Sequence, residues 1–252
     1  MIRLVALVAF FCLPLVIGTA IAAPVVITQA IANAGGVTPG DGPGFPVTIS
    51  QPGSYRLGSN LDVTAAKNGI LVTTSDVTID LDGFRISGGP AGGVATNAVT
   101  GILGQSDRLT VKNGTIGGFR NRGIDTFTHA YLVVENMRIV NNRYFGIYAP
   151  GFVARIQNNT VATNQGDGVL CGPGCHAEGN VISTNGDRGL AIRRGMALGN
   201  TIVSNGSFGI LSLGLEIVGI GNNTLIDNNS GGPQIDGITV SLEPNACGNT
   251  TC

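Results

Sequence analysis

The chain has 252 residues, of which 43% are apolar, 12% are charged and 40 are glycine, and its formal net charge is −1. This length predicts one domain or two small ones, with enough apolar residues to build a core. The small charged share and the many glycines argue against a helical protein, and the near-neutral charge provides no basic surface for nucleic acid.

The N-terminus has the parts of a secretory signal peptide. Arg3 gives the start of the chain a positive charge, residues 4–17 are apolar, and residues 20–22 form an Ala-Ile-Ala cleavage site. We expect residues 1–22 to be removed, leaving a secreted protein, in the periplasm or outside the cell, without membrane attachment. The alternative is a membrane anchor, because the apolar run is nearly long enough to span a bilayer. Pro14 and the cleavage site favour removal.

Residues 23–58 are predicted to form an N-terminal loop and capping coil. Residues 35–46 read GGVTPGDGPGFP, a composition typical of turns and loops. We expect this segment to run into a partial coil at residues 45–57. It would cover one end of the repeats that follow, because the open end of a strand stack exposes unpaired backbone groups.

Residues 59–252 contain a sequence repeat. A glycine followed by an aliphatic or similar residue recurs at Gly69, Gly101, Gly123, Gly146, Gly168, Gly189 and Gly209. The intervals are 20–23 residues, except for the first, which is 32 residues and contains a loop that we expect to be inserted on one coil. Within a repeat, aliphatic residues alternate, as at Val77, Ile79 and Leu81, which is the two-residue period of a strand. Repeats of this length cannot bury their own apolar face, so we expect short parallel strands stacked coil on coil.

Two polar columns accompany the strands. In five repeats, an asparagine lies three positions after an aliphatic residue that recurs once in each repeat: Asn142, Asn164, Asn185, Asn205 and Asn228. Stacked asparagine amides can hydrogen-bond along the stack and satisfy buried turn backbone, so we predict a structural ladder rather than glycosylation sites. Residues that tolerate a left-handed backbone precede the same aliphatic residues by three positions, at Gly83, Asn113, Asn136, Asn158, Gly179, Gly199 and Asn222.

This pattern resembles the right-handed parallel β-helix family of the pectate-lyase-like superfold, over about residues 60–244. The opening ISQPGSYRLGSNLDV resembles the entry coil of secreted bacterial members, and the ending LEPNACGNTTC resembles a cysteine-containing tail seen there. The resemblance implies an all-β, single-stranded right-handed parallel β-helix of about seven to eight coils. Because such relatives cleave, epimerise or bind acidic polysaccharides, it also implies a polysaccharide partner.

Four cysteines remain after removal of the leader. Their proximity predicts two local disulfides, Cys171 with Cys175 and Cys247 with Cys252, although three pairings are formally open. A zinc site at Cys171, Cys175 and His176 would lack a second ligand pair, and export favours oxidation. We expect no metal cofactor, with calcium left open.

The residues around the glycine anchors provide the candidate site, because these columns are expected to face solvent. The candidates for catalysis are Arg122, Asp125, His129 and Arg188, and those for binding are Tyr144, Tyr148, Asp167 and Asp187. Arginines can hold carboxylates bidentately, and aromatic rings, here with Phe145 and Phe208, can stack on sugars. A histidine near a carboxylate is a candidate base. The alternative is that these are ordinary surface ion pairs.

The motifs of known relatives are absent. The hydrolase signatures do not occur, and residues 145–150, FGIYAP, lack the Asp and His of the epimerase motif that they partly resemble. Whether the protein is an enzyme is therefore left open. We predict a monomer that binds or processes an extracellular polysaccharide, lyase- or epimerase-like at most. The alternative is a non-catalytic surface, matrix or adhesion protein.

Overall fold

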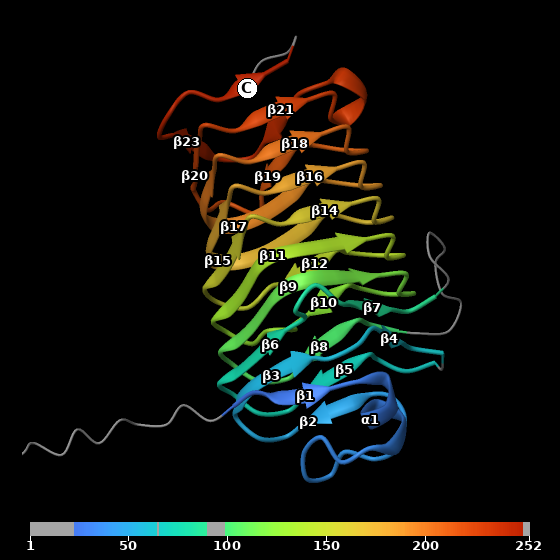
Figure 1. Ribbon diagram of the computed structural model, residues 1–252. Coiled ribbons are helices and arrows are strands. Elements are labelled where there is room, and N and C mark those ends of the chain that lie inside the picture. The colour runs from blue at the N-terminus through green and yellow to red at the C-terminus, as the bar shows by residue number, and fades with distance from the viewer. Residues whose placement is uncertain (1–22, 65, 90–98, 249–252) are drawn as a thin grey trace, which may run out of the picture.

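The computed structural model describes residues 23–64, 66–89 and 99–248, so the predicted signal peptide lies outside it. Almost all of the regular secondary structure in the described chain is β-strand, stacked in parallel into a solenoid of about eight turns. The colour in Figure 1 runs steadily along the stack from blue to red, which shows that each coil lies on the preceding one. The predicted fold class is confirmed. No helix in these residues is long and apolar enough to cross a membrane.

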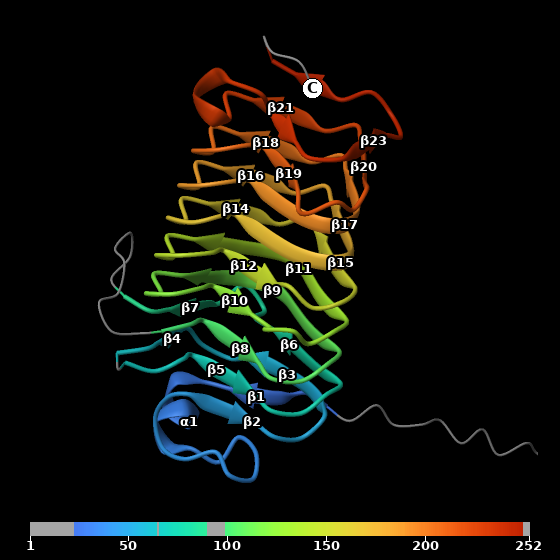
Figure 2. The ribbon, with the colours of Figure 1, turned by 180° about the vertical axis from the view of Figure 1, so that it is seen from behind.

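Three faces run along the solenoid, and the chain visits them in the order 1, 2, 3 in each coil. Face 1 consists of β2 (Val47–Ile49), β5 (Ile70–Val72), β8 (Ile102–Gly104), β10 (Ile124–Asp125), β12 (Ile147–Ala149), β19 (Ile210–Ser212), β22 (Ile235–Asp236) and the first parts of β15 (Val169–Glu178) and β17 (Leu190–Leu198). Figure 2 shows the same stack from behind.

The other two faces complete each coil. Face 2 consists of β1 (Val25–Ile27), β3 (Gly53–Leu57), β6 (Val77–Asp80), β13 (Ala154–Gln157), β20 (Val218–Gly221), β23 (Thr239–Ser241), the first parts of β9 (Leu109–Gly117) and β11 (Leu132–Val140), and the ends of β15 and β17. Face 3 consists of β4 (Leu61–Asp62), β7 (Arg85–Ser87), β14 (Thr160–Ala162), β16 (Val181–Ser183), β18 (Thr201–Val203), β21 (Thr224–Ile226), β24 (Ala246–Cys247) and the ends of β9 and β11.

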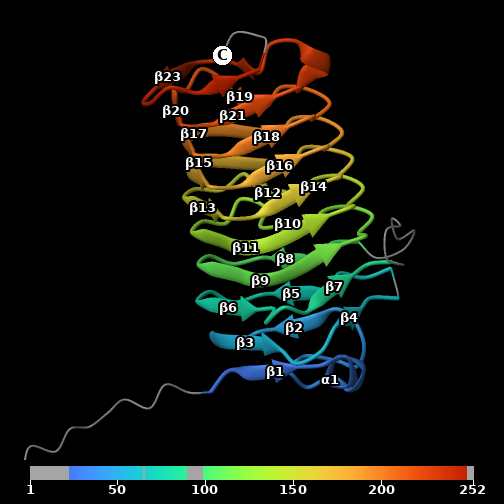
Figure 3. The same cartoon turned by 45° about the horizontal axis from the view of Figure 1, so that its top comes forward.

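The core consists of aliphatic columns that run through the middle of the stack. Ile102, Ile124 and Ile147 occupy equivalent places on face 1 and are completely buried. Burying each such side chain contributes about 1.5–3 kcal/mol. Since successive strand residues point to opposite sides, the same alternation that predicted strands sends every second residue into this core. Figure 3 shows the stacked coils with the C-terminal end brought forward.

The turn from face 2 to face 3 uses a left-handed residue in every coil from β6 to β21. The seven residues predicted for this role all have positive φ: Gly83, Asn113, Asn136, Asn158, Gly179, Gly199 and Asn222. Glycine adopts this conformation without a Cβ clash, and the conformation costs less free energy for asparagine than for most other residues. The turn chemistry therefore agrees with the sequence prediction.

The predicted asparagine ladder is present. Asn142, Asn164, Asn185 and Asn205 each donate from Nδ2 to the Oδ1 of the asparagine in the next coil, over 2.8–3.0 Å, and Asn228 ends the ladder on Gln234. All of these residues are buried. The same Oδ1 atoms accept from backbone N–H groups, so each amide satisfies polar groups that burial would otherwise leave unpaired.

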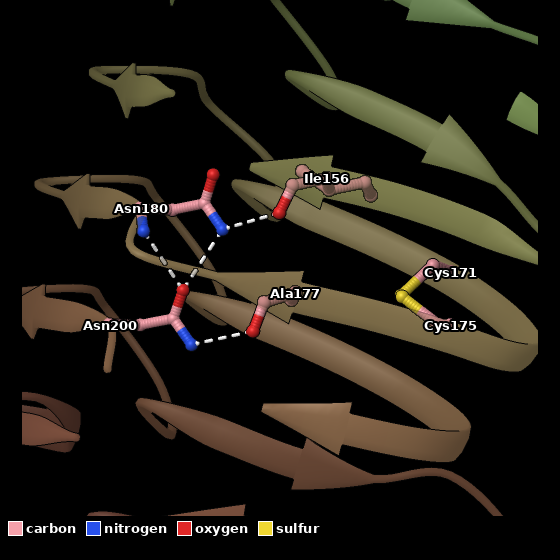
Figure 4. Close-up of a disulfide and its surroundings, with 6 residues drawn as sticks. All are labelled: Ile156, Cys171, Cys175, Ala177, Asn180 and Asn200. Carbon is pink, nitrogen blue, oxygen red and sulfur yellow. Dashed lines mark hydrogen bonds between the residues drawn. A yellow bond between two sulfur atoms is a disulfide. The ribbon is translucent and has the colours of Figure 1, made fainter. Parts of the chain in front are cut away.

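A second ladder, which the sequence interpretation missed, follows the left-handed turn. Asn159, Asn180, Asn200 and Asn223 donate to one another in turn, and the last donates to Asn245. Figure 4 shows the step from Asn180 to Asn200, with each Nδ2 also donating to a backbone oxygen of the preceding coil. The signal was available, since these asparagines directly follow the left-handed residues.

The glycine anchors are required by space and not by backbone conformation. A Cβ on Gly146 would lie 2.6 Å from the backbone oxygen of Gly168 and 2.5 Å from Cγ1 of Val161. A Cβ on Gly168 would meet Gly189 O at 2.7 Å in the same way. The anchor column therefore marks a place where neighbouring coils and the core approach too closely for a side chain.

The N-terminal segment is more regular than the expected loop. Residues 25–27 form β1, which pairs with β3, and α1 (Gln29–Ala34) follows, begun by Thr28, whose side chain accepts from Ile31 N at 3.2 Å. The helix lies at the N-terminal end of the stack (Figure 1), with Ala32 buried in the core. At six residues, α1 is too short to show helical periodicity in the sequence.

The predicted disulfide between Cys171 and Cys175 is present within β15 (Figure 4). It also removes both sulfurs from the zinc site considered for these residues. Cys252 lies outside the described residues, so its pairing with Cys247 stays a prediction. Most of the long insertion between Gly69 and Gly101, residues 90–98, lies outside them too.

Candidate functional site

The candidate site lies at the corner where the chain enters face 1, over the coils of β10, β12, β15 and β17. The glycine anchors align these coils: Gly123 N donates to Phe145 O, Gly146 N to Asp167 O, and Gly168 N to Arg188 O, over 2.9–3.1 Å. The residue before each anchor therefore stacks on its equivalent in the next coil. This is the register on which the candidate site was predicted.

Arg122 is the centre of a group that we call the aromatic cluster, which consists of Arg122, Asp125, Tyr144, Phe145 and Tyr148. Its Nη1 donates to Asp125 Oδ2 in an ion pair. Its Cζ lies 3.9 Å from the ring centroid of Tyr148, and the other two rings lie within 6 Å. A guanidinium over an aromatic face is attracted by the ring quadrupole.

The rings of the aromatic cluster also contact one another. The centroids of Tyr144 and Phe145 are 4.3 Å apart, and those of Phe145 and Tyr148 are 5.1 Å apart with nearly parallel planes. Tyr144 is half exposed, Tyr148 is partly exposed and Phe145 is buried beneath them. The outer surface of the cluster is therefore formed largely by two tyrosine rings.

The expectation that the whole candidate site faces solvent is wrong for three residues. Asp125, Phe145 and Asp167 are buried. Asp125 points outward from β10, but Arg122 pairs with it and its Oδ1 accepts from Phe127 N at 2.9 Å. Neighbouring side chains, rather than strand orientation, determine this burial. Asp125 thus holds Arg122 in place and is not open to solvent.

A second ion-pair group lies two coils further along. Arg188 Nε donates to Asp167 Oδ1 at 2.9 Å, Arg188 N donates to the same oxygen at 3.1 Å, and Asp187 lies 3.8 Å from the guanidinium. Burial raises the pKa of Asp167 above its ordinary value, and the charge of Arg188 opposes that rise. Asp167 Oδ2 is buried without a hydrogen-bond partner in the described chain.

The remaining candidates do not join these two groups. Nδ1 of His129 lies 3.5 Å from Asp107, whereas Asp125, the candidate carboxylate nearest to it in the sequence, pairs with Arg122. Phe208 is partly exposed and makes no ring contact with the other described aromatic residues. Among the described residues, no three His, Cys, Asp or Glu side chains form a group that could hold a metal ion.

Two arginines beside the aromatic cluster were not among the predicted site residues. Arg120 and Arg143 are both exposed, at the corner between face 3 and face 1. Arg143 N donates to Phe119 O and Tyr144 N to Asn121 O, each over 2.8 Å, so the two arginines lie on adjoining coils. Each arginine directly follows the residue at the ladder position of its coil, which is Phe119 in one coil and Asn142 in the next. This spacing was visible in the sequence.

In a comparison with known proteins, no curated protein matches the chain. A solved structure, the A-module of the mannuronan C-5 epimerase AlgE4 of Azotobacter vinelandii, matches with a TM-score of 0.43 and 16% sequence identity, covering 86% of this chain and 79% of that one. Residues 53–208 match the family model described as the right-handed beta helix region. This match spans more than half of the sequence, and the chain belongs to the right-handed β-helix family.

Proposed function

We propose that this protein is secreted and binds an extracellular polysaccharide at the aromatic cluster on face 1. The observation that carries the proposal is the pair of tyrosine rings, Tyr144 and Tyr148, with Arg122 fixed beneath them by a buried carboxylate. Tyrosine offers an apolar ring face for the C–H face of a sugar and a hydroxyl for its polar edge.

The rings are held in position before any ligand arrives. Arg122 contacts Tyr148 at 3.9 Å and is tied to Asp125, while Phe145 supports both tyrosines from below. A surface with fixed side chains loses little conformational entropy on binding. The parallel coils also align this surface with the solenoid axis, which suits a ligand that is itself a long chain.

Binding is favoured over chemical processing, because the candidate acids and bases have other partners. Asp125 is buried under Arg122, Asp167 is buried under Arg188, and His129 lies beside Asp107. A general base must reach the proton that it abstracts. None of these three groups presents a free carboxylate or imidazole next to the exposed tyrosines.

Secretion is supported by the predicted leader and by the disulfide between Cys171 and Cys175, since disulfides persist mainly outside the reducing cytosol. The proposed ligand would accordingly be met outside the cytosol.

Proton NMR of a panel of polysaccharides mixed with the mature protein, with and without calcium, tests the proposal. Binding is expected to broaden the lines of one polymer without new sugar signals, and Tyr144→Ala with Tyr148→Ala is expected to abolish the broadening. Phe152→Ala is the matched control, because Phe152 is an exposed aromatic residue outside the cluster. New unsaturated or epimerised sugar signals would show processing and overturn the non-catalytic assignment.

A protein-binding surface role is the second candidate. Exposed apolar side chains gather near the C-terminal end of the stack, at Leu215, Ile217, Ile238, Val240 and Leu242. Exposed apolar groups of this kind often mark protein contacts. If no polysaccharide in the panel binds, these residues become the site to test.

A further inference from the structure

We infer that Arg120 and Arg143 form an anion-binding subsite beside the aromatic cluster, which takes a carboxylate or sulfate group of the polysaccharide. The inference rests on the proposed function and adds that the polysaccharide is negatively charged. Neither residue was among the predicted site residues, and the two arginines that were predicted to hold carboxylates have other roles in the structure.

The two arginines lie side by side at the edge of the aromatic cluster. Phe119 O and Asn121 O, on either side of Arg120, accept from the N–H groups of Arg143 and Tyr144. The two arginines therefore lie on adjoining coils, and neighbouring strands are about 4.8 Å apart. Arg143 directly precedes Tyr144, the most exposed ring of the cluster. A sugar stacked on that ring would have the two guanidinium groups at its edge.

Among the described residues, the two arginines also have no carboxylate paired with them to balance their charge. Several cations of the described chain are matched by carboxylates on adjoining coils, as in the pairs of Arg56 with Asp82 at 2.8 Å and Arg108 with Asp76 at 2.6 Å, whereas others, such as Arg138, have no ion pair among the described residues. Arg120 and Arg143 instead place like charges next to each other, which costs stability. Neither guanidinium has an ion pair or hydrogen bond within the described residues. A ligand anion would offset that repulsion.

The arginines first expected to bind carboxylates are already occupied. Arg122 pairs with Asp125, and Arg188 pairs with Asp167 and lies near Asp187. Their charges are therefore neutralised within the protein. Arg120 and Arg143 are left as uncommitted cations next to the cluster, and the guanidinium fork matches the two oxygens of a carboxylate or sulfate.

Titration of three polymers into the full mature protein tests the subsite: a polyuronate, a sulfated galactan and an uncharged glucan. The double variant Arg120→Gln with Arg143→Gln removes both charges and keeps polar side chains of similar length. We expect it to weaken binding of the charged polymer by about tenfold or more, which is the effect of losing one charge-assisted hydrogen bond. The matched control is Arg138→Gln, since Arg138 is another exposed arginine without a partner among the described residues, but on face 3.

The outcomes separate the subsite from the proposed function. Binding of the polyuronate or the sulfated galactan, lost in the double variant and kept in the control, supports the subsite, and the preferred polymer identifies the anion. Equal binding of the uncharged glucan, unchanged in the double variant, overturns the subsite and leaves the proposed function standing. Absence of binding by all three polymers removes both. Circular dichroism of the double variant establishes that any loss is not unfolding.

Discussion

Asn164 and Asn185 lie one coil apart in the buried ladder, and Nδ2 of Asn164 donates to Oδ1 of Asn185 over 3.0 Å. The same Oδ1 accepts from the backbone N–H of Asn164 at 3.1 Å, while Nδ2 of Asn185 donates to Val161 O and to Asn205 Oδ1. The side chain of Asn185 thus bonds polar groups of both neighbouring coils. The ladder consequently joins repeats that touch only their neighbours.

Replacing Asn185 with alanine should destabilise the protein strongly. The substitution removes the partner of the buried Asn164 backbone N–H and one partner each of Asn164 Nδ2, Val161 O and Asn205 Oδ1, and each group left unpaired costs about 1–3 kcal/mol. We expect a loss of about 3 kcal/mol or more in the free energy of unfolding, measured by urea denaturation. The control is Asn33→Ala on the exposed side of α1, which should change it by less than about 0.5 kcal/mol. Equal losses of stability in the two variants would show that the ladder hydrogen bonds of Asn185 contribute no more than those of an exposed asparagine.

The repeat columns were predictable because they depend on local requirements. A left-handed turn needs glycine or asparagine, as at Asn158, and a buried turn needs an amide, as at Asn164. Burial of Asp125 was not predictable in this way. It points outward from its strand but is covered by Arg122 and Tyr148, which come from a turn and from the next coil. Side-chain cover of this kind is not encoded in a two-residue period.

The glycine anchors lead to a second prediction, for Gly168→Ala. The new Cβ would lie 2.7 Å from Gly189 O, 2.6 Å from Cγ2 of Ile182 and 2.7 Å from Nδ2 of Asn185. Backbone and core would both have to shift, which costs about 1–3 kcal/mol or more. Gly42→Ala is the control, since nothing lies within 4 Å of its Cβ position and its φ is not in the left-handed region. A similar melting temperature for both variants would show that the anchors tolerate a side chain.

The disulfide should contribute modestly to stability. Cys171 and Cys175 are four residues apart, and closing so short a loop removes little entropy from the unfolded chain. This entropy corresponds to about 2 kcal/mol of stabilisation. We expect the double replacement by alanine to lower the free energy of unfolding by about this amount, and reduction of the native protein to have a similar effect. Complete unfolding on reduction would mean that the bond does more than close this loop.

Asp167 should make the stability of the protein depend on pH. Burial raises its pKa in the folded protein above the ordinary value of 3.8, despite the opposing charge of Arg188. A raised acid pKa means that the folded state binds more protons than the unfolded state. The stabilisation is therefore fully present below the unfolded pKa and is lost as pH rises through the folded pKa. Asp167→Asn removes this titration.

The measurement is urea denaturation of the native protein and the Asp167→Asn variant across a pH series that extends both below and above the ordinary carboxyl pKa. The native protein should lose stability relative to the variant as pH rises. Asp76→Asn provides a control of opposite sign, because the hydrogen bond from Arg108 lowers the pKa of the exposed Asp76. There the native protein keeps its advantage above the unfolded pKa and loses it as pH falls through the folded pKa. Parallel curves for Asp167→Asn and the native protein would show that the buried carboxyl titrates normally, with Arg188 fully compensating its burial.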